Sequence, residues 1–185
     1  LEQNPRTIVF ARTKRGAARL ARQLTTNGVD AVDLHGDLDQ KKRERNLARF
    51  TRGEADVIVA TDIAARGIHV DGVSLVVHYD APAEHKAYTH RSGRTARAGE
   101  AGTVVTLTTP EDLRDVVTLQ RKAGVAARQH RAERLPERLT AETLATSGEA
   151  PAQQPAGQNH GGQGLGGQRQ GGGAARPAGQ GRSRN

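Results

Sequence analysis

The chain has 185 residues, and 28 Lys and Arg against 20 Asp and Glu give it a net charge of +8 at pH 7. A basic excess of this kind favours polyanions such as nucleic acid. The chain contains no cysteine. This excludes disulfides, thiolate metal sites and cysteine nucleophiles. No apolar run approaches the roughly 20 residues of a membrane span, so we expect no membrane partner, and a cytoplasmic location.

Composition divides the chain into three parts. Twelve of its 22 glycines follow Thr146, and beyond that residue there is no Val, Ile, Phe or Tyr. Such a segment cannot bury enough apolar surface to offset its ordering entropy. We therefore predict a folded domain over 1–124, a basic helical extension over 125–146, and a disordered Gly/Gln/Arg-rich tail over 147–185.

Short apolar runs alternate with stretches of helical periodicity along the first 124 residues. Thr13 and Asp39 are predicted N-caps, Gly28 and Gly53 end the two helices that follow them, and Pro110 is predicted to start the last helix. The predicted elements, in chain order, are strand 7–11, helix 13–28, strand 29–34, helix 39–53, strand 56–60, strand 73–79, helix 84–91, strand 102–108 and a helix from 110.

This alternation predicts an α/β fold, with an open, mostly parallel sheet and helices on both faces. Ligands of such sheets bind at the carboxyl ends of the strands. We therefore expect the chemistry at residues 11–14, 35–39, 61–69 and the segment after Tyr79.

Three segments contain residues suited to that chemistry. The segment His90–Arg97 holds three Arg and one His, which suits phosphate oxygens or a solvated basic helix end. In Thr61–His69, a glycine and a hydroxyl follow a buried strand, as in a ligand loop or an ordinary capped turn. In His35–Arg43, a glycine precedes a helix start, which fits a phosphate site or a solvent-facing first turn.

Taken together, the order and spacing of these segments resemble the second RecA-like domain of DEAD-box ATP-dependent RNA helicases. That family is marked by His-Arg-x-Gly-Arg-Thr-x-Arg, Thr-Asp-x-Ala-Ala-Arg-Gly-x-Asp and His-Gly-x-x-x-Gln-x-x-Arg, together with a strand–Phe segment, here Ile8–Thr13. The resemblance covers roughly residues 7–119. The His90–Arg97 motif is specific enough to disfavour the alternative of a DNA-acting helicase.

The resemblance implies a role for each matching residue. Arg94 and Arg97 correspond to arginine fingers that stabilise charge on the γ-phosphate of ATP. It implies contacts to the nucleotide or the partner domain for His90, Arg91, Gly93, Arg66, Gly67 and His69. It implies contacts to the RNA backbone for Arg12, Gly36, Gln40, Arg43, Thr61 and Asp62.

One position departs from the family. His69 stands where the family usually has Asp, so the fixed negative charge implied in ribose recognition is missing here. The other histidines form no spacing typical of a metal site, and we predict none.

The family's ATP-binding motifs are absent from the 185 residues, which contain no Gly-x-x-x-x-Gly-Lys-Ser/Thr loop and no Asp-Glu-Ala-Asp. ATP with Mg²⁺ would thus be bound mainly by an N-terminal RecA-like domain, the second expected partner besides RNA. The start at Leu1 also predicts a piece of a longer protein, inactive alone. A standalone, non-catalytic RNA-binding or annealing module is the alternative. The tail reads as an auxiliary RNA-binding arm or as a solubilising linker.

Overall fold

The computed structural model describes residues 6–68, 70–97 and 99–134. It contains a five-stranded sheet of order β2-β3-β1-β4-β5, in which every pair of neighbours is parallel. This confirms the predicted fold class. The elements are β1 (Arg6–Phe10), α1 (Lys14–Thr26), β2 (Ala31–Leu34), α2 (Gln40–Thr51), β3 (Val57–Ala60), α3 (Asp62–Ala65), β4 (Val73–His78), α4 (His85–Ser92), β5 (Thr103–Thr106), α5 (Leu113–Lys122) and the short 3₁₀ helix η1 (Ala132–Arg134).

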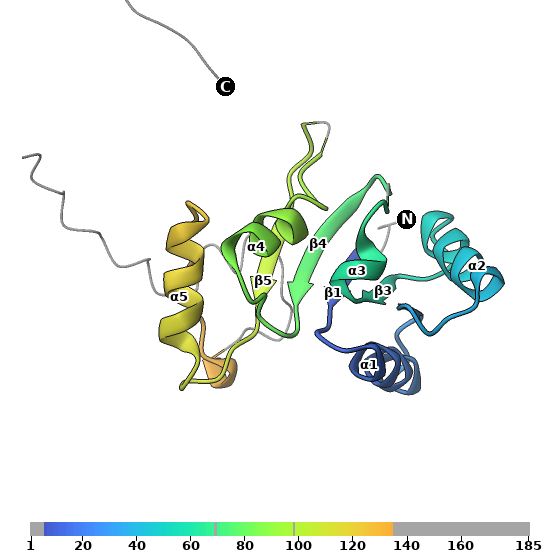
Figure 1. Cartoon of the computed structure of the whole chain (residues 1–185), viewed down its shortest axis with the longest axis horizontal. Coiled ribbons are helices and arrows are strands. Elements are labelled where there is room, and N and C mark those ends of the chain that lie inside the picture. Colours follow the sequence, from blue (N-terminus) through green and yellow to red (C-terminus); the bar gives the residue numbers. More distant parts are fainter. Residues whose placement is uncertain (1–5, 69, 98, 135–185) are drawn as a thin grey trace, which may run out of the picture. The chain divides into compact units, whose positions relative to one another are not determined.

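Helices cover both faces of the sheet. On one face, Ala17 and Ala21 of α1 pack on Val9 and Val59. On the other face, Phe50 of α2 and the alanines of α3 share a core with β1, β2, β3 and β4. In Figure 1, α3 and α4 lie in front of the sheet, while α5 lies beside α4 at the β5 edge. β3 is buried along its whole length, as its run of apolar β-branched residues predicts.

Local side-chain chemistry sets where the first two helices begin and end. The Thr13 hydroxyl accepts a hydrogen bond from the Gly16 amide at 3.0 Å, and the Asp39 carboxylate accepts one from the Lys42 amide at 2.7 Å. Both predicted N-caps are therefore confirmed. Gly28 has a φ of 83°, a left-handed conformation that disfavours other residues and ends α1.

The last predicted helix begins later than expected. The Thr109 hydroxyl accepts from the Asp112 amide at 3.3 Å and donates to the Asp112 carboxylate at 3.0 Å, so a side-chain turn occupies this segment. α5 consequently starts at Leu113 rather than at Pro110.

The structure describes only residues 125–134 of the predicted helical extension. The preceding helix, α5, ends at Lys122, and Gly124 turns the chain with a φ of 73°. Within residues 125–134 the regular helix is the three-residue η1. The remainder of the extension, the predicted tail and His69 lie outside the described residues. Within the described part of the chain, none of the helices is long and apolar enough to cross a membrane.

Candidate nucleic-acid interface and arginine cluster

An open cavity of about 600 Å³ lies where β1, β2 and β3 end. Parallel strands deliver their carboxyl ends to one edge, so residues distant in sequence meet there. This confirms that Arg12, Gly36, Thr61 and Asp62, predicted from separate motifs, share one surface. The cavity is lined by Arg12, Thr13, Lys14, Arg15, Gly36, Asp37, Thr61, Asp62 and Ile63.

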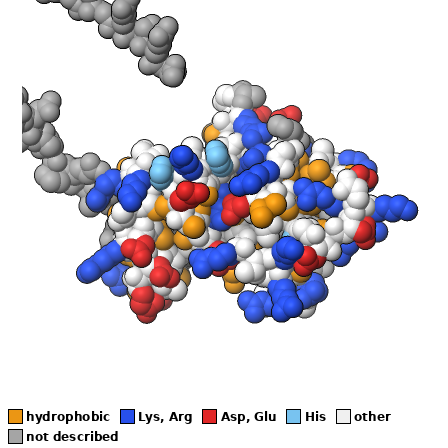
Figure 2. Space-filling view, viewed as in Figure 1, with side chains coloured by type: hydrophobic (Ala, Val, Ile, Leu, Met, Phe, Trp, Pro, Cys, Tyr) orange, Lys and Arg blue, Asp and Glu red, His pale blue; other side chains and the backbone are white. Residues whose placement is uncertain are grey.

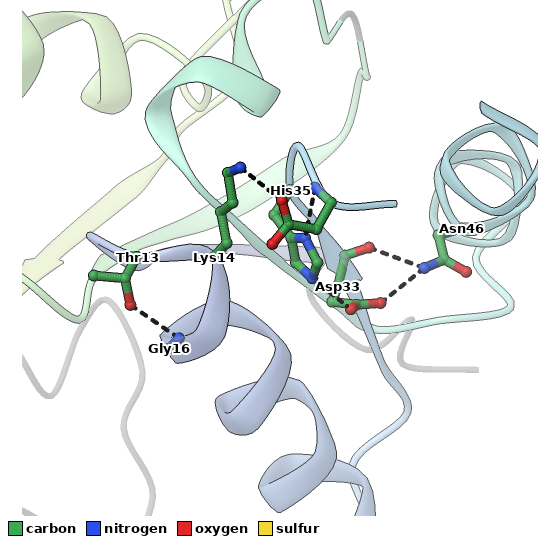
Figure 3. A network of polar contacts seen from close by, with 7 residues as sticks. Thr13, Lys14, Gly16, Asp33, His35 and Asn46 are labelled. Atoms are coloured by element: carbon green, nitrogen blue, oxygen red, sulfur yellow. Dashed lines mark hydrogen bonds and ion pairs between the residues drawn. The ribbon is translucent and has the colours of Figure 1, made fainter. Parts of the chain in front are cut away.

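The first residue of α1 reaches across this cavity. Because Thr13 caps the helix, Lys14 leaves its first turn toward the loop after β2, and its Nζ lies 2.6 Å from Oδ1 of Asp37 (Figure 3). A Cβ placed on Gly36 would lie only 3.4 Å from Cε of Lys14. The lysine stem thus lies over the loop backbone, at about the van der Waals contact distance of a methyl group on Gly36.

A chain of buried polar contacts fixes the loop after β2 (Figure 3). The Asn46 amide donates to the Asp33 carbonyl at 2.9 Å and to its carboxylate at 3.0 Å. Nε2 of His35 is 3.0 Å from the other carboxylate oxygen, and Nδ1 of His35 accepts from the Asp37 amide at 3.3 Å. These contacts assign the imidazole proton to Nε2. Asn46 of α2 and Asp33 of β2 therefore hold the loop through His35, a positioning residue.

Charge in the cavity is mostly positive. Arg12, Lys14 and Arg15 line it beside two carboxylates, Asp37 and Asp62. The Lys14 ammonium holds the pKa of Asp37 below its ordinary value, so this carboxylate stays ionised at neutral pH. Figure 2 shows Lys and Arg side chains gathered over α1, at lower right, and acidic ones around the start of α5, at lower left. Cations, hydroxyls and open backbone at one edge suit a phosphodiester chain.

Arg91 is engaged inside the domain. Its side chain is 3% exposed, and its Nε and Nη2 each lie 2.6 Å from a carboxylate oxygen of Asp62. Its Nη1 donates to the Asp80 carbonyl at 2.7 Å, and the guanidinium lies 5.0 Å from the centre of the Phe10 ring. Within the described residues, the Arg91 side chain joins α4 to the start of α3, and the interdomain contact that we predicted for it stays a prediction. Asp62 lines the cavity as well as pairing with Arg91, and the RNA contact predicted for it stays a prediction.

The two predicted arginine fingers lie next to each other. Nη1 of Arg94 donates to the Ile68 carbonyl at 2.8 Å, and Nε of Arg97 donates to the Gly93 carbonyl at 2.9 Å. Burial, followed by the charge of Arg97, lowers the pKa of Arg94. Because the two neighbouring guanidinium groups repel each other, the cluster favours the binding of an anion between or beside them.

This arginine cluster is not at the carboxyl edge where we expected the segment after Tyr79. The Thr95 hydroxyl donates to the carbonyl of Val73, the first residue of β4. Arg94, Thr95 and Arg97 also line a small cavity of about 50 Å³ with residues 70–73 and Glu100. α4 therefore carries the cluster toward the amino end of β4, and a second, separate surface results.

The backbone around the cluster is tightly constrained. Ala96 has a φ of 55°, a left-handed conformation that costs a non-glycine residue about 1–2 kcal/mol. A Cβ on Gly102 would come within 2.2 Å of the Thr95 hydroxyl oxygen and 2.6 Å of the Ala96 amide nitrogen. The loop is thus packed against the start of β5, which fixes the origin of the Arg94 and Arg97 side chains.

Two predicted RNA-binding residues do not line the cavity. The Gln40 amide donates to Glu44 at 2.6 Å, one turn further along α2. Nη2 of Arg43 donates to the Ala64 carbonyl at 2.8 Å and ties α2 to α3. Their spacing placed them on one helix face correctly, but it gave no information on the direction of that face. Of the remaining predicted residues, Arg66, Gly67, His90 and Gly93 are exposed outside both cavities.

Sequence reasoning missed several residues that line the large cavity. Thr13, Lys14 and Asp37 lay in the segments 11–14 and 35–39 where we expected the chemistry, but Thr13 was singled out only as a cap and Lys14 and Asp37 had no individual role, while Arg15 lay outside these segments. A basic residue directly after an N-cap at a strand end was the available signal, since the first turn of a crossover helix starts at the ligand edge. No such signal exists for Asp37, whose partner is 23 residues away.

Comparison with known proteins identifies the family. The model of the helicase conserved C-terminal domain matches residues 1–99. The ATP-dependent RNA helicase CshA of Limosilactobacillus reuteri is 46% identical over 107 residues, which are 58% of this chain and 22% of that protein. The structure of S. cerevisiae Dbp5 bound to RNA and ADP BeF3 matches with a TM-score of 0.61 and 33% identity, over 65% of this chain and 33% of that one.

A solved C-terminal domain of the DEAD-box protein Dbp5 also matches, with 33% identity, a TM-score of 0.59, and coverage of 67% of this chain and 73% of that domain. The chain therefore belongs to the helicase conserved C-terminal domain family, and its fold is that of the RecA-like C-terminal domains of DEAD-box RNA helicases. It spans about a fifth to a quarter of the length of the curated relatives CshA and RhpA.

Proposed function

We propose that the cavity at the ends of β1, β2 and β3 binds the sugar–phosphate backbone of RNA. The observation that carries this proposal is the convergence of Arg12, Lys14 and Arg15 on one open cavity with the Gly36 backbone. Backbone and 2′-hydroxyl contacts of this kind give a preference for RNA with little reading of sequence. The likeness to a Dbp5 structure with bound RNA supports RNA as the ligand.

The second part of the proposal concerns ATP. Arg94 and Arg97 act as arginine fingers on ATP with Mg²⁺ that an N-terminal RecA-like domain of the same protein binds. Their proximity and the lowered pKa of Arg94 support this, because the cluster gains most from an anionic partner. The described residues contain no cluster of His, Asp and Glu suited to a metal ion. The residues of this chain would supply positive charge and orientation to the γ-phosphate.

The whole protein is, on this proposal, a cytoplasmic ATP-dependent RNA helicase. Its two domains close together on ATP and RNA, and this chain contributes half of each surface. We expect the 185 residues alone to release no phosphate from ATP, because they lack the phosphate loop.

RNA binding is tested by fluorescence anisotropy with a labelled single-stranded oligouridylate over a salt series. Lys14→Ala and Arg12→Ala should each weaken binding, and each should reduce the slope of log K against log salt by up to about 0.7, the value for one complete phosphate contact. Arg52→Ala is the matched control for Lys14→Ala, because Arg52 also belongs to an exposed ion pair, with Glu54 at 2.7 Å, outside the cavity. Equal effects of Arg52→Ala and Lys14→Ala would contradict the assigned surface.

The ATP role is tested by phosphate release. In the complete protein, Arg94→Ala or Arg97→Ala should reduce turnover by about 10³- to 10⁵-fold, the range seen for arginine fingers. Nucleotide affinity in the open state should change little, since the fingers act in the closed state. RNA-stimulated turnover by the 185-residue chain would refute the need for a second domain. ATP-independent annealing of RNA strands by the 185-residue chain would favour the alternative function, a standalone annealing module.

A further inference from the structure

We propose that Asp37 is an internal competitor of the RNA phosphate for Lys14, so that the Lys14–Asp37 ion pair tunes how tightly the cavity binds RNA. This inference rests on the RNA-binding function proposed above. It assigns to Asp37 a role opposite to that of its neighbours in the cavity, namely weakening the complex.

Geometry places the carboxylate where a phosphate would bind. Nζ of Lys14 and Oδ1 of Asp37 are 2.6 Å apart, and both residues line the large cavity (Figure 3). A Cβ on Gly36 would lie 3.7 Å from Nζ, so the ammonium group stands over the open backbone of the loop. An anion approaching that backbone therefore meets Lys14 already paired with Asp37.

Electrostatics keeps this pair formed in the free protein. Asp37 faces Lys14 and Arg15 on α1 and His35 on its own loop, and these neighbours favour its ionised form. The positive charge of Lys14 is thus neutralised before RNA arrives. A phosphate must displace the carboxylate or share the ammonium group with it, and in either case less counterion is released on binding than a free lysine would give.

The fold does not depend on the Asp37 side chain. Among the described residues, the Asp37 side chain forms its ion pair with Lys14, and both side chains are more than half exposed. The loop is held instead by the Asp37 backbone amide, which donates to His35 at 3.3 Å. The variant Asp37→Asn keeps that amide and the side-chain shape but removes the charge, so it isolates the competition.

The test measures affinity for a labelled single-stranded oligouridylate by anisotropy across a salt series. Asp37→Asn should bind more tightly than the wild type, by up to about fivefold at low salt, which is the size of an exposed ion pair. Its slope of log K against log salt should steepen by up to about 0.7, the value for one complete phosphate contact on a single strand, less what the paired Lys14 already contributes in the wild type.

Glu54→Gln is the matched control. It removes the same charge from an exposed pair of similar length, Arg52–Glu54 at 2.7 Å, which lies outside the cavity. Any gain that Glu54→Gln shows reports the change in net charge alone. Only the excess of Asp37→Asn over this control counts for the proposal.

A double-mutant cycle identifies Lys14 as the group released. In the Lys14→Ala background, Asp37→Asn should give no gain beyond that of Glu54→Gln. If Lys14→Ala weakens RNA binding but Asp37→Asn raises the affinity no more than Glu54→Gln does, the competition is refuted, while the proposed RNA-binding surface is supported. A gain from Asp37→Asn that persists without Lys14 also refutes it. If Lys14→Ala has no effect, or RNA does not bind, the proposed surface itself fails.

Discussion

His78 should make the stability of this domain strongly dependent on pH. Its ring is 0% exposed at the end of β4, and it lies 4.9 Å from the ring centre of Tyr88 and 6.2 Å from that of Phe10. Nδ1 is 3.0 Å from the Thr106 hydroxyl, while Nε2 has no hydrogen-bond partner among the described residues. Burial first, and then the charge of Arg91, lower the pKa of His78 from 6.5 to about 4, with Asp62 partly opposing.

The sign and size of the effect follow from proton binding. The unfolded chain protonates His78 near pH 6.5, whereas the folded domain does so only near pH 4. Between these values protons stabilise the unfolded state, so stability is full above pH 6.5 and falls as the pH drops to about 4. At about 1.4 kcal/mol for each pH unit, the free energy of unfolding should lose about 3 kcal/mol over this window.

Urea unfolding followed by far-ultraviolet circular dichroism tests this, and suits a chain without tryptophan. His78→Phe keeps an aromatic ring between Phe10 and Tyr88 but cannot take up a proton, so its stability should fall about 3 kcal/mol less than that of the wild type between pH 7 and pH 4. His90→Asn, at an exposed position, controls for the loss of one histidine. Equal pH dependence in His78→Phe and the wild type would refute the reasoning. So would an NMR titration of wild-type His78 with a midpoint near 6.5.

Three further outcomes are expected. Asp62→Ala should cost about 3 kcal/mol in urea unfolding, near the lower end for a broken buried pair because Asp62 is 41% exposed, and more than Arg91→Met, which leaves no buried charge behind. Gly102→Ala should cost about 1–3 kcal/mol, since its Cβ would overlap Thr95 and the backbone of Ala96. Removal of residues 147–185, which hold four Arg and one Glu, should flatten the salt dependence of RNA binding by up to about 3 in slope, and an unchanged slope would identify that segment as a spacer.

The sheet was predictable because local pattern and burial agree along the strands. The run Val57–Ala60 is apolar and mostly β-branched, and the structure buries all of it as an interior strand of the parallel sheet. Thr13 and Asp39 were predictable caps because a cap acts within three residues. Pro110 misled because the Thr109–Asp112 turn uses the same residues that a helix start would use.

The site was predictable only where topology converts sequence into position. Each parallel strand ends at the same edge, so Arg12, Gly36 and Thr61 could be placed together without knowing any side-chain contact. Gln40 and Arg43 could not be placed this way, because the helical period fixes which residues share a face but not what the face meets. Arg91 raised a different difficulty. The sequence of a basic motif does not show whether an arginine binds an external anion or forms an ion pair within the domain, as Arg91 does with Asp62.

The motif His90–Arg97 contains arginines of both kinds, one that is paired within the domain and two that are available to an external anion. Arg91 is neutralised by Asp62 and held by the Asp80 carbonyl, so its contacts are complete within the domain. Arg94 and Arg97 donate to backbone carbonyls, and no carboxylate is paired with either among the described residues. A guanidinium with only neutral acceptors keeps its full charge for a further partner. One motif thus provides both a structural cation, which fixes α4 against α3, and two cations that lie at a separate surface, beside Asp71 and Glu100 but without an ion pair to either.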